Sequence, residues 1–295
     1  MTSFLNTSRP PVFCPGCTHD RITKSLDAAL VTLGVPDHKT VIVTDIGCSG
    51  LFDTFFNVHA LHGVHGRALT YAAGLKLADP SLNVIVTMGD GGMGIGGAHV
   101  LAACRKNLDM TLIILNNFNF GMTGGQYSAT TPSDAQVGSA FLNQAEIPMD
   151  ICGVVESAGA TYVSRISGHD DALANELVSA MQHKGFAVVE TLGLCTGRYT
   201  KRNQLTPKVI DQMIAQRPSP GGMIAKNQRP EYGERYRQLA QEKGIFPDPF
   251  VVKKQFDMPD ARRHEVVILG SAGMRIVTAG DMVCFAHGEH RRQPH

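Results

Sequence analysis

Four apolar runs divide the first 200 residues of the chain, and each run ends in a glycine-rich or polar turn. They are TVIVTDIGCSG (40–50), NVIVTMGDGG (83–92), MTLIILNNFNFG (110–121) and GFAVVETLGLC (185–195). Val, Ile and Leu follow one another in these runs without regular alternation with polar residues, which is typical of strands buried on both faces of a parallel sheet. We therefore predict that each run begins as a buried strand and ends as a loop.

Helical patterns separate the predicted strands. They cover roughly residues 19–34, 66–79, 94–107 and 170–184. This alternation of strands and helices predicts an α/β fold with a doubly wound parallel sheet. In such a sheet ligands bind at the carboxyl ends of the strands. The four unusual loops named above all lie at such ends and are candidate functional loops.

The pattern is weaker beyond about residue 197. Residues 199–208 and 215–230 are polar and contain proline and glycine, which indicates an extended arm. Residues 229–244 predict a surface helix. Residues 264–284 predict one more strand, glycine turn and helix.

The composition is that of a globular protein with a rather uncharged surface. Hydrophobic residues make up 43% and charged residues 18% of the 295 residues, which favours a subunit that buries surface against a partner. Lys plus Arg (27) balances Asp plus Glu (26), so we expect neither nucleic acid nor an anionic membrane as a partner. No run approaches a membrane span, and the polar start MTSFLNTSRP is not typical of a signal peptide, so a cytoplasmic location is expected.

A possible diphosphate site lies between residues 89 and 117. GDGG follows a predicted strand, and the next strand ends in two asparagines. The Asp90 carboxylate, the Asn117 amide oxygen and the Asn119 backbone carbonyl would supply three oxygens to Mg²⁺, and two phosphate oxygens and a water would complete its octahedron. A glycine turn without a ligand is the alternative that GDG alone would leave open.

The glycines of this motif suit the same ligand. Gly91 and Gly92, which follow Gly89 and Asp90, allow backbone N–H groups to approach an anion closely. The segment FGMTGGQ, which begins at Phe120, adds a further glycine-rich loop after the second strand. Together these features favour a diphosphate held through a divalent cation.

The motif VFCPGCTHD places Cys14 and Cys17 near the start of the chain, where they could hold a metal, form a redox disulfide or lie in a turn. Seven cysteines in a cytoplasmic protein indicate thiols or metal ligands rather than a disulfide framework. The paired CxxC…CxxC spacing of structural zinc sites is absent. A thioredoxin-like dithiol would leave Cys48 and Cys195, which both follow predicted strands, without a role.

These motifs resemble the β subunit of 2-oxoacid:ferredoxin oxidoreductases. GDG through NN is similar to the thiamine diphosphate signature, and three further segments resemble this family: HGRALTYAAGLKLA (65–78), IGGAHVLAACRKN (95–107) and NFGMTGGQYSATTP (119–132). The resemblance covers roughly residues 12 to 200. The ordered set CPGC…IGCSG…HGRAL…MTGGQYS is most similar to 2-oxoglutarate:ferredoxin oxidoreductases.

The resemblance implies a [4Fe–4S] cluster beside thiamine diphosphate. Its four thiolates would be those of Cys14, Cys17, Cys48 and Cys195. Zinc or unliganded thiols remain the alternatives. The other three cysteines, Cys104, Cys152 and Cys284, are interpreted as small buried hydrophobes.

The resemblance also implies a set of cofactor contacts, with Mg²⁺ held by Asp90, Asn117 and Asn119. The expected contacts are Ile46, Gly47, Cys48, Ser49, His65, Gly66, Arg67, Gly89, Asp90, Gly91, Gly92, Asn117, Asn119, Gly121, Met122 and Thr123. His65 is also a candidate catalytic residue. No glutamate lies in a recognisable motif for activating thiamine, and in the family this residue comes from the partner subunit.

The activity implied is the coenzyme A-dependent oxidative decarboxylation of a 2-oxoacid, with electrons passing through the cluster to ferredoxin. The substrate expected is 2-oxoglutarate, giving succinyl-CoA and CO₂, within an (αβ)₂ hetero-oligomer. Many family members carry a basic residue directly after CSG, where this chain has Leu51. Pyruvate, branched-chain and aryl 2-oxoacids therefore stay open as substrates. Two other functions also stay open: a thiamine-dependent decarboxylase or carboligase without electron transfer, and a non-catalytic subunit with a structural cluster.

Two domains are expected on this basis. Residues 1–200 would form the thiamine diphosphate and cluster domain, of the diphosphate-binding type. Residues 201–295 would form a partner-contacting extension. Its segment 264–284 resembles the opening of the small γ domain of these enzymes, and is either a remnant of that domain or a strand and helix that complete the fold.

Overall fold

The structure is a computed structural model that describes residues 3–217, 221–244, 279–280 and 282–283. Its centre is a seven-stranded sheet in the order β2-β1-β3-β4-β6-β5-β7, in which only β7 is antiparallel to its neighbour. The strands are β1 (Thr40–Thr44), β2 (His59–His62), β3 (Asn83–Gly89), β4 (Met110–Asn116), β5 (Tyr162–Ser167), β6 (Phe186–Leu192) and β7 (Gly222–Lys226). The predicted α/β fold with a doubly wound sheet is confirmed.

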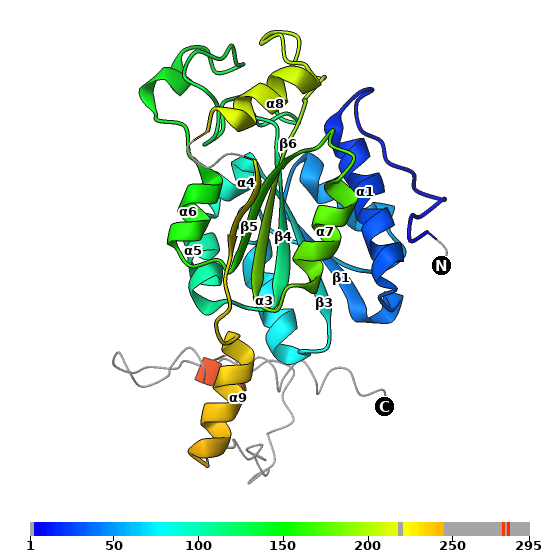
Figure 1. Cartoon of the computed structure of the whole chain (residues 1–295), viewed down its shortest axis with the longest axis vertical. Helices are drawn as coiled ribbons and strands as arrows, with labels where there is room; N and C mark the ends of the chain where they lie inside the picture. The colour runs from blue at the N-terminus through cyan, green and yellow to red at the C-terminus, as the bar shows by residue number, and fades with distance from the viewer. Residues whose placement is uncertain (1–2, 218–220, 245–278, 281, 284–295) are drawn as a thin grey trace, which may run out of the picture. The chain divides into compact units, whose positions relative to one another are not determined.

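Helices cover both faces of the sheet, with α1 and α7 on one face and α5 and α6 on the other (Figure 1). The helices are α1 (Thr18–Leu33), α2 (Phe52–Phe55), α3 (Ala68–Ala78), α4 (Asp90–Ile95), α5 (Gly97–Lys106), α6 (Ile151–Ser157), α7 (Leu173–Gln182), α8 (Pro207–Ala215) and α9 (Tyr232–Glu242). Along β1, Val41 and Val43 pack with α3 and α5, while Ile42 packs with α1 and α7. Burial on both faces explains why the strand sequences do not alternate.

The four predicted strands are present as β1, β3, β4 and β6, and each stops before the loop that ended its run. Three strands were not predicted. β2 is short and exposed, β7 lies in the polar arm, and β5 contains the charged Arg165. That arginine is fully buried because it pairs with Glu190, its direct neighbour in the register with β6.

One predicted helix is broken. The pattern over 94–107 predicted a single helix, but α4 ends at Ile95 and α5 begins at Gly97. A side chain at Gly96 would lie 2.2 Å from the carbonyl oxygen of Gly66, so the loop that carries His65 packs directly on the break. The helix is interrupted where another backbone segment approaches it.

The chain divides into two compact units, Met1–Phe246 and Pro247–His295. Within the first unit, Ile210 and Ile214 of α8 pack with Phe118 and Leu192, and β7 pairs with β5. The predicted surface helix is present as α9. The predicted elements in 264–284, and Cys284, lie outside the described residues except for 279–280 and 282–283, and the contacts of the C-terminal extension with a partner stay a prediction.

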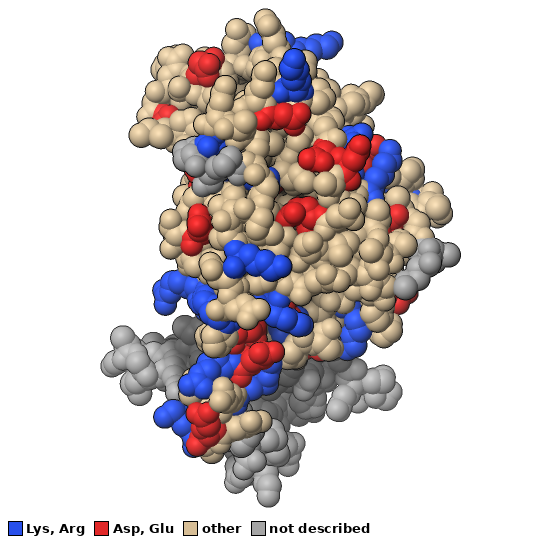
Figure 2. Space-filling model, in the orientation of Figure 1, with Lys and Arg blue, Asp and Glu red and all other residues tan. Residues whose placement is uncertain are grey.

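Charged side chains of both signs are interspersed with much uncharged surface on the face that Figure 2 shows. This distribution agrees with the near balance of 27 basic and 26 acidic residues in the sequence. None of the helices in the described part of the chain is long and apolar enough to cross a membrane.

Candidate active site

A cavity of about 120 Å³ lies at the carboxyl ends of β1, β3 and β4, and we call it the edge cavity. It is lined by all of the predicted cofactor contacts except Gly66 and Arg67, and additionally by His19, Leu115 and Phe120. Gly66 is buried below the rim against Gly96, and Arg67 is exposed outside the cavity. The sequence therefore predicted most of the residues that meet here.

Asp90, Asn117 and Asn119 lie together at one side of the edge cavity. The sequence predicted this, because these residues follow the ends of two successive buried strands, which are β3 and β4. The backbone N–H of Asn117 donates to Asp90 Oδ1 (3.4 Å), and Asn119 Nδ2 donates to Asn117 Oδ1 (3.2 Å). All three side chains are buried. Burial raises the pKa of Asp90 to about 6, because no cationic side chain offsets the loss of water around its charge. A divalent cation at this carboxylate would supply the missing counter-charge.

One further feature of this side fits a cation-bound diphosphate. Asn119 Oδ1 is buried and accepts no hydrogen bond from the protein, so an acceptor oxygen is left for a ligand. The two glycines after Asp90 are required by close packing: a Cβ atom at Gly91 would lie 2.2 Å from the Phe120 ring, and one at Gly92 would lie 2.0 Å from Asp45 Oδ2.

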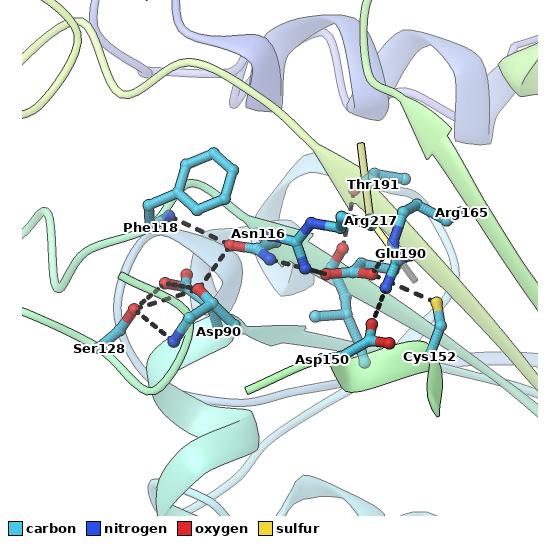
Figure 3. A network of polar contacts seen from close by, with 12 residues as sticks. Asp90, Asn116, Phe118, Ser128, Asp150, Cys152, Arg165, Glu190, Thr191 and Arg217 are labelled. Carbon is cyan, nitrogen blue, oxygen red and sulfur yellow. Dashed lines mark hydrogen bonds and ion pairs between the residues drawn. The ribbon is translucent and has the colours of Figure 1, made fainter. Parts of the chain in front are cut away.

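A buried polar network holds Asp90 from behind (Figure 3). The Ser128 hydroxyl donates to Asp90 Oδ2. The single proton of the Thr130 hydroxyl can be donated either to Asp90 Oδ2 (3.3 Å) or to Asn116 Oδ1 (2.9 Å). Asn116 Nδ2 donates to Glu190 Oε1 (2.7 Å). The network thus connects the loop after β4 with the centre of the sheet.

The far end of this network is a buried ion-pair cluster around Glu190 (Figure 3). Arg165 Nε donates to Glu190 Oε2 (2.6 Å), and the same guanidinium binds Asp150, which lies directly before α6. Arg217 lies 3.9 Å from Glu190 Oε1, and Cys152 Sγ lies 3.2 Å from Oε2. Cys152 and Cys104 are fully buried, as predicted.

His65 is oriented by Asp45, a residue that the sequence analysis did not single out. His65 Nδ1–H donates to Asp45 Oδ2 (2.9 Å), and the Gly66 N–H donates to Asp45 Oδ1 (2.6 Å). Because a carboxylate only accepts, the proton of the neutral ring is on Nδ1, and Nε2 is left as the acceptor. The His65 ring also meets the Phe120 ring edge-on at 5.9 Å. In the sequence, the only indication of a role for Asp45 is its position as the first polar residue after β1.

The four predicted cluster cysteines come from three loops that lie close together, and Cys48 also lines the edge cavity. A Cβ at Gly121 would lie 3.1 Å from Cys195 Sγ, and one at Gly197 would lie 3.0 Å from Cys14 Sγ. Charges on Cys14, Cys48 and Cys195 would each raise the pKa of Cys17, so these thiols are electrostatic neighbours. The structure therefore brings all four cysteines together.

Backbone contacts join the first and last of these loops. The Thr18 N–H donates to the Leu194 carbonyl (3.3 Å), and the Leu194 N–H donates to Thr18 Oγ1 (2.7 Å). Thr196 Oγ1 donates to the Pro15 carbonyl (2.9 Å). The thiols themselves are held by few partners, and Cys14 is exposed.

Among the residues that the structure describes, no three His, Cys, Asp or Glu side chains are arranged to hold a single metal ion. Burial raises the pKa of Cys17 to about 12 and also raises the pKa of Cys48, so bound iron would have to displace their protons.

His19 is the most unusual residue of the cavity wall. Its ring is 4% exposed, and neither ring nitrogen has a hydrogen-bond partner. Burial lowers the pKa of His19 to about 4. A buried polar group without a partner costs about 1–3 kcal/mol of stability. The residue lies inside the quoted motif CPGCTHD, but no sequence pattern distinguishes it from a core histidine.

Comparison with known proteins shows the family to which the chain belongs. Residues 45–191 match the family model of the thiamine pyrophosphate enzyme, C-terminal TPP binding domain. The chain is 42% identical over 188 residues to 2-oxoglutarate synthase subunit KorB of Archaeoglobus fulgidus, covering 63% of this chain and 70% of that one. It is 32% identical over 265 residues to the KorB subunit of Methanothermobacter marburgensis, covering 89% and 93%.

The chain belongs to the family of 2-oxoacid:ferredoxin oxidoreductase β subunits, of the 2-oxoglutarate synthase type. The predicted resemblance to this β-subunit family is confirmed. A solved 2-oxoglutarate:ferredoxin oxidoreductase from Magnetococcus marinus, with 2-oxoglutarate, coenzyme A and succinyl-CoA bound, has the same fold. The TM-score is 0.73 at 28% identity, over 81% of this β-subunit chain and 89% of the neighbour.

Proposed function

We propose that this β subunit, with an α partner, converts 2-oxoglutarate and coenzyme A to succinyl-CoA and CO₂ and passes the electrons to ferredoxin. The observation that carries the proposal is that one cavity is lined by the oxygen set at Asp90 and by Cys48, which is one of four neighbouring thiols. A decarboxylase or carboligase without electron exit would have no use for the thiol set.

Asp90, Asn117 and Asn119 hold Mg²⁺ and through it the diphosphate of thiamine diphosphate. Two observations support this assignment: a buried carboxylate without a counter-charge among the described residues, and an unused acceptor oxygen, Asn119 Oδ1, at the same side of the cavity. Thiamine diphosphate supplies the carbon nucleophile and the electron sink for decarboxylation when it is bound. This chain's part is to fix the cofactor's charged tail and to exclude water around it.

Cys14, Cys17, Cys48 and Cys195 hold the [4Fe–4S] cluster. The four thiols are electrostatic neighbours, and a [4Fe–4S] cluster takes one thiolate at each of its four irons. Cys48 and Ser49 line the same cavity as Asp90, so the cluster side and the diphosphate side share a wall.

The partner subunit completes the site. The edge cavity measures about 120 Å³, whereas complete small-molecule pockets measure about 300–1,000 Å³. Ile46 and Met122 line its mouth with 38% and 55% of their surface exposed, which suits a rim that another subunit covers. No glutamate is among the described residues that line it, so the activating carboxylate comes from the α subunit.

There is a second candidate for the substrate. No lysine or arginine is among the described residues of the cavity wall, and Leu51 follows the CSG motif. A dicarboxylate therefore needs a cation from the α subunit. If the α subunit offers none, a 2-oxoacid with an uncharged side chain, such as pyruvate, is the better substrate.

The test uses the protein purified under anaerobic conditions with its α partner. Iron, thiamine diphosphate and magnesium are measured, and reduction of a viologen dye is followed with coenzyme A and each of 2-oxoglutarate, pyruvate, branched-chain and aryl 2-oxoacids. We expect all three cofactors and the highest kcat/KM with 2-oxoglutarate. Iron-free protein that still decarboxylates would overturn the electron-transfer assignment, and preference for pyruvate would overturn the substrate.

A further inference from the structure

The His19 ring is a buried polar group for which the edge cavity offers no protein partner. It is 4% exposed, and both Nδ1 and Nε2 lack hydrogen bonds. Other partly buried histidines of the chain behave differently, since His169 Nε2 bonds the Thr18 hydroxyl (2.8 Å) and His183 Nε2 bonds the Thr161 hydroxyl (2.7 Å). A neutral imidazole has one N–H, and that donor requires an acceptor.

The position of His19 indicates where this acceptor lies. The residue is in the first turn of α1, two positions after Cys17, and its backbone N–H bonds the Cys17 sulfur. The Phe13 ring packs against the imidazole at 5.4 Å and restricts its orientation. The imidazole shares the cavity wall with Gly47 and Cys48. Two of the four cluster cysteines are therefore its neighbours, one along the chain and one across the cavity.

We propose that His19 donates its ring N–H to a sulfur of the cluster and thereby raises the reduction potential of that cluster. The inference rests on the proposed function, because it assumes that the four cysteines hold iron and sulfide. Cluster sulfurs are hydrogen-bond acceptors, and each bond from the protein stabilises the more negative, reduced state. His19 thus makes the cluster a better acceptor for electrons that leave the substrate.

The test compares three variants of the complete complex with the wild type. His19→Phe keeps a flat ring and removes the donor, His19→Gln keeps an N–H donor on a different frame, and Leu115→Val alters the same cavity wall without touching a donor. The midpoint potential of the cluster is measured by redox titration followed by electron paramagnetic resonance. We expect a more negative potential in His19→Phe, a smaller shift in His19→Gln and no shift in Leu115→Val.

An unchanged potential in His19→Phe, at full iron content, would overturn the proposal. If that variant binds no iron, electron spin-echo modulation of protein labelled with ¹⁵N in the histidine rings only, and not in the backbone, decides instead. A weak nitrogen coupling that the wild type shows and His19→Gln lacks would support the bond, and equal spectra would overturn it. A potential that stays constant while KM for the 2-oxoacid rises would assign His19 to the substrate and overturn the proposal.

These outcomes are separable from failure of the proposed function. A wild-type complex without iron would remove the cluster and the His19 inference together. A wild-type complex whose cluster is reduced by 2-oxoglutarate, with an unchanged potential in His19→Phe, would remove the His19 inference alone.

Discussion

The two sides of the edge cavity differ in how much of the protein's own structure holds them in place. On the diphosphate side, Asp90 and Asn117 follow adjacent strands of the sheet, and a buried network through Ser128 and Thr130 fixes the carboxylate. On the cluster side, the cysteines lie on three loops, and Cys14 is exposed. Backbone contacts join those loops, but the thiols themselves have few partners.

This difference indicates that the two ligands have different relations to the fold. The sheet edge and the network preorganise the oxygen ligands, so the proposed Mg²⁺ would meet a site that already exists. The proposed cluster would replace contacts that the loops lack, and its binding energy would contribute to ordering them. Loss of the cluster should therefore alter the structure more than loss of the diphosphate. Four substitutions test this comparison, from the largest expected effect to the smallest.

The largest effect is expected from Cys48→Ser. We expect loss of the cluster and of 2-oxoacid-dependent dye reduction, together with faster proteolysis of the segments around residues 14 and 196. Iron analysis, activity and limited proteolysis measure these changes. The matched control is Cys104→Ser, because Cys104 is a fully buried cysteine of α5. The complex that carries this substitution should retain its full iron content. Equal iron content in both variants would show that the ligand set is wrong.

Asp90→Ala should come next. Removing the carboxylate should weaken retention of thiamine diphosphate by more than about 100-fold, because a ligand to the metal is lost outright and losing an outer partner alone costs about 10–100-fold. The brown cluster should remain, and the proteolysis pattern should match that of the wild type. Cofactor content and the visible spectrum report both results. Loss of the chromophore in this variant would contradict the separation of the two sides.

Asp45→Asn should have a smaller effect. The two Asp45 oxygens each accept one hydrogen bond, from His65 and from the Gly66 N–H, and asparagine has only one oxygen. We expect activity to fall about 10–100-fold, as for loss of other outer partners, with iron and thiamine diphosphate retained. Steady-state kinetics on the loaded complex measures this. As a control, Asp53→Asn, which changes the partner of His62 on the same face, should have little effect. Activity of Asp45→Asn equal to the wild type would remove the orienting role.

Ser128→Ala should have the smallest effect. Asp90 would lose one of its donors but keep Thr130 and the Asn117 N–H. We expect Mg²⁺ affinity to fall about 10-fold, at the lower end of the range for outer partners, with little change in thermal stability. Titration of Mg²⁺ into the cofactor-depleted complex measures this, and Ser179→Ala on the exposed side of α7 is the control. A loss as large as that of Asp90→Ala would mean that the network, not the ligand itself, determines binding.

The sequence predicted those parts of the fold and site that depend on local pattern and strand order. Runs of Val, Ile and Leu identified β1, β3, β4 and β6, and the rule that parallel strands end at one edge predicted that Asp90 and Asn117 lie together. These features need no knowledge of distant partners, because the carboxyl ends of parallel strands lie at the same edge of a sheet whatever the strand order.

The remaining features depend on pairs that are distant in sequence. The charged Arg165 argues against a buried strand at β5 in the sequence. Its burial is explained by its ion pair with Glu190, its neighbour in the register with β6. The break at Gly96 follows from the approach of Gly66, and the role of Asp45 follows from where the His65 loop packs. In the sequence His19 cannot be distinguished from an ordinary core histidine, and the structure is needed to show that its ring nitrogens lack hydrogen bonds. Each of these requires the tertiary structure.

The central claim is that the diphosphate side and the cluster side of one cavity act in a single electron path. The most direct measurement adds 2-oxoglutarate and coenzyme A to the anaerobic complex without ferredoxin and follows the cluster by freeze-quench electron paramagnetic resonance. The account predicts that a reduced-cluster signal appears within one turnover and that Asp90→Ala, with full iron, does not produce it. CO₂ release without any reduction of a fully loaded cluster would contradict the account.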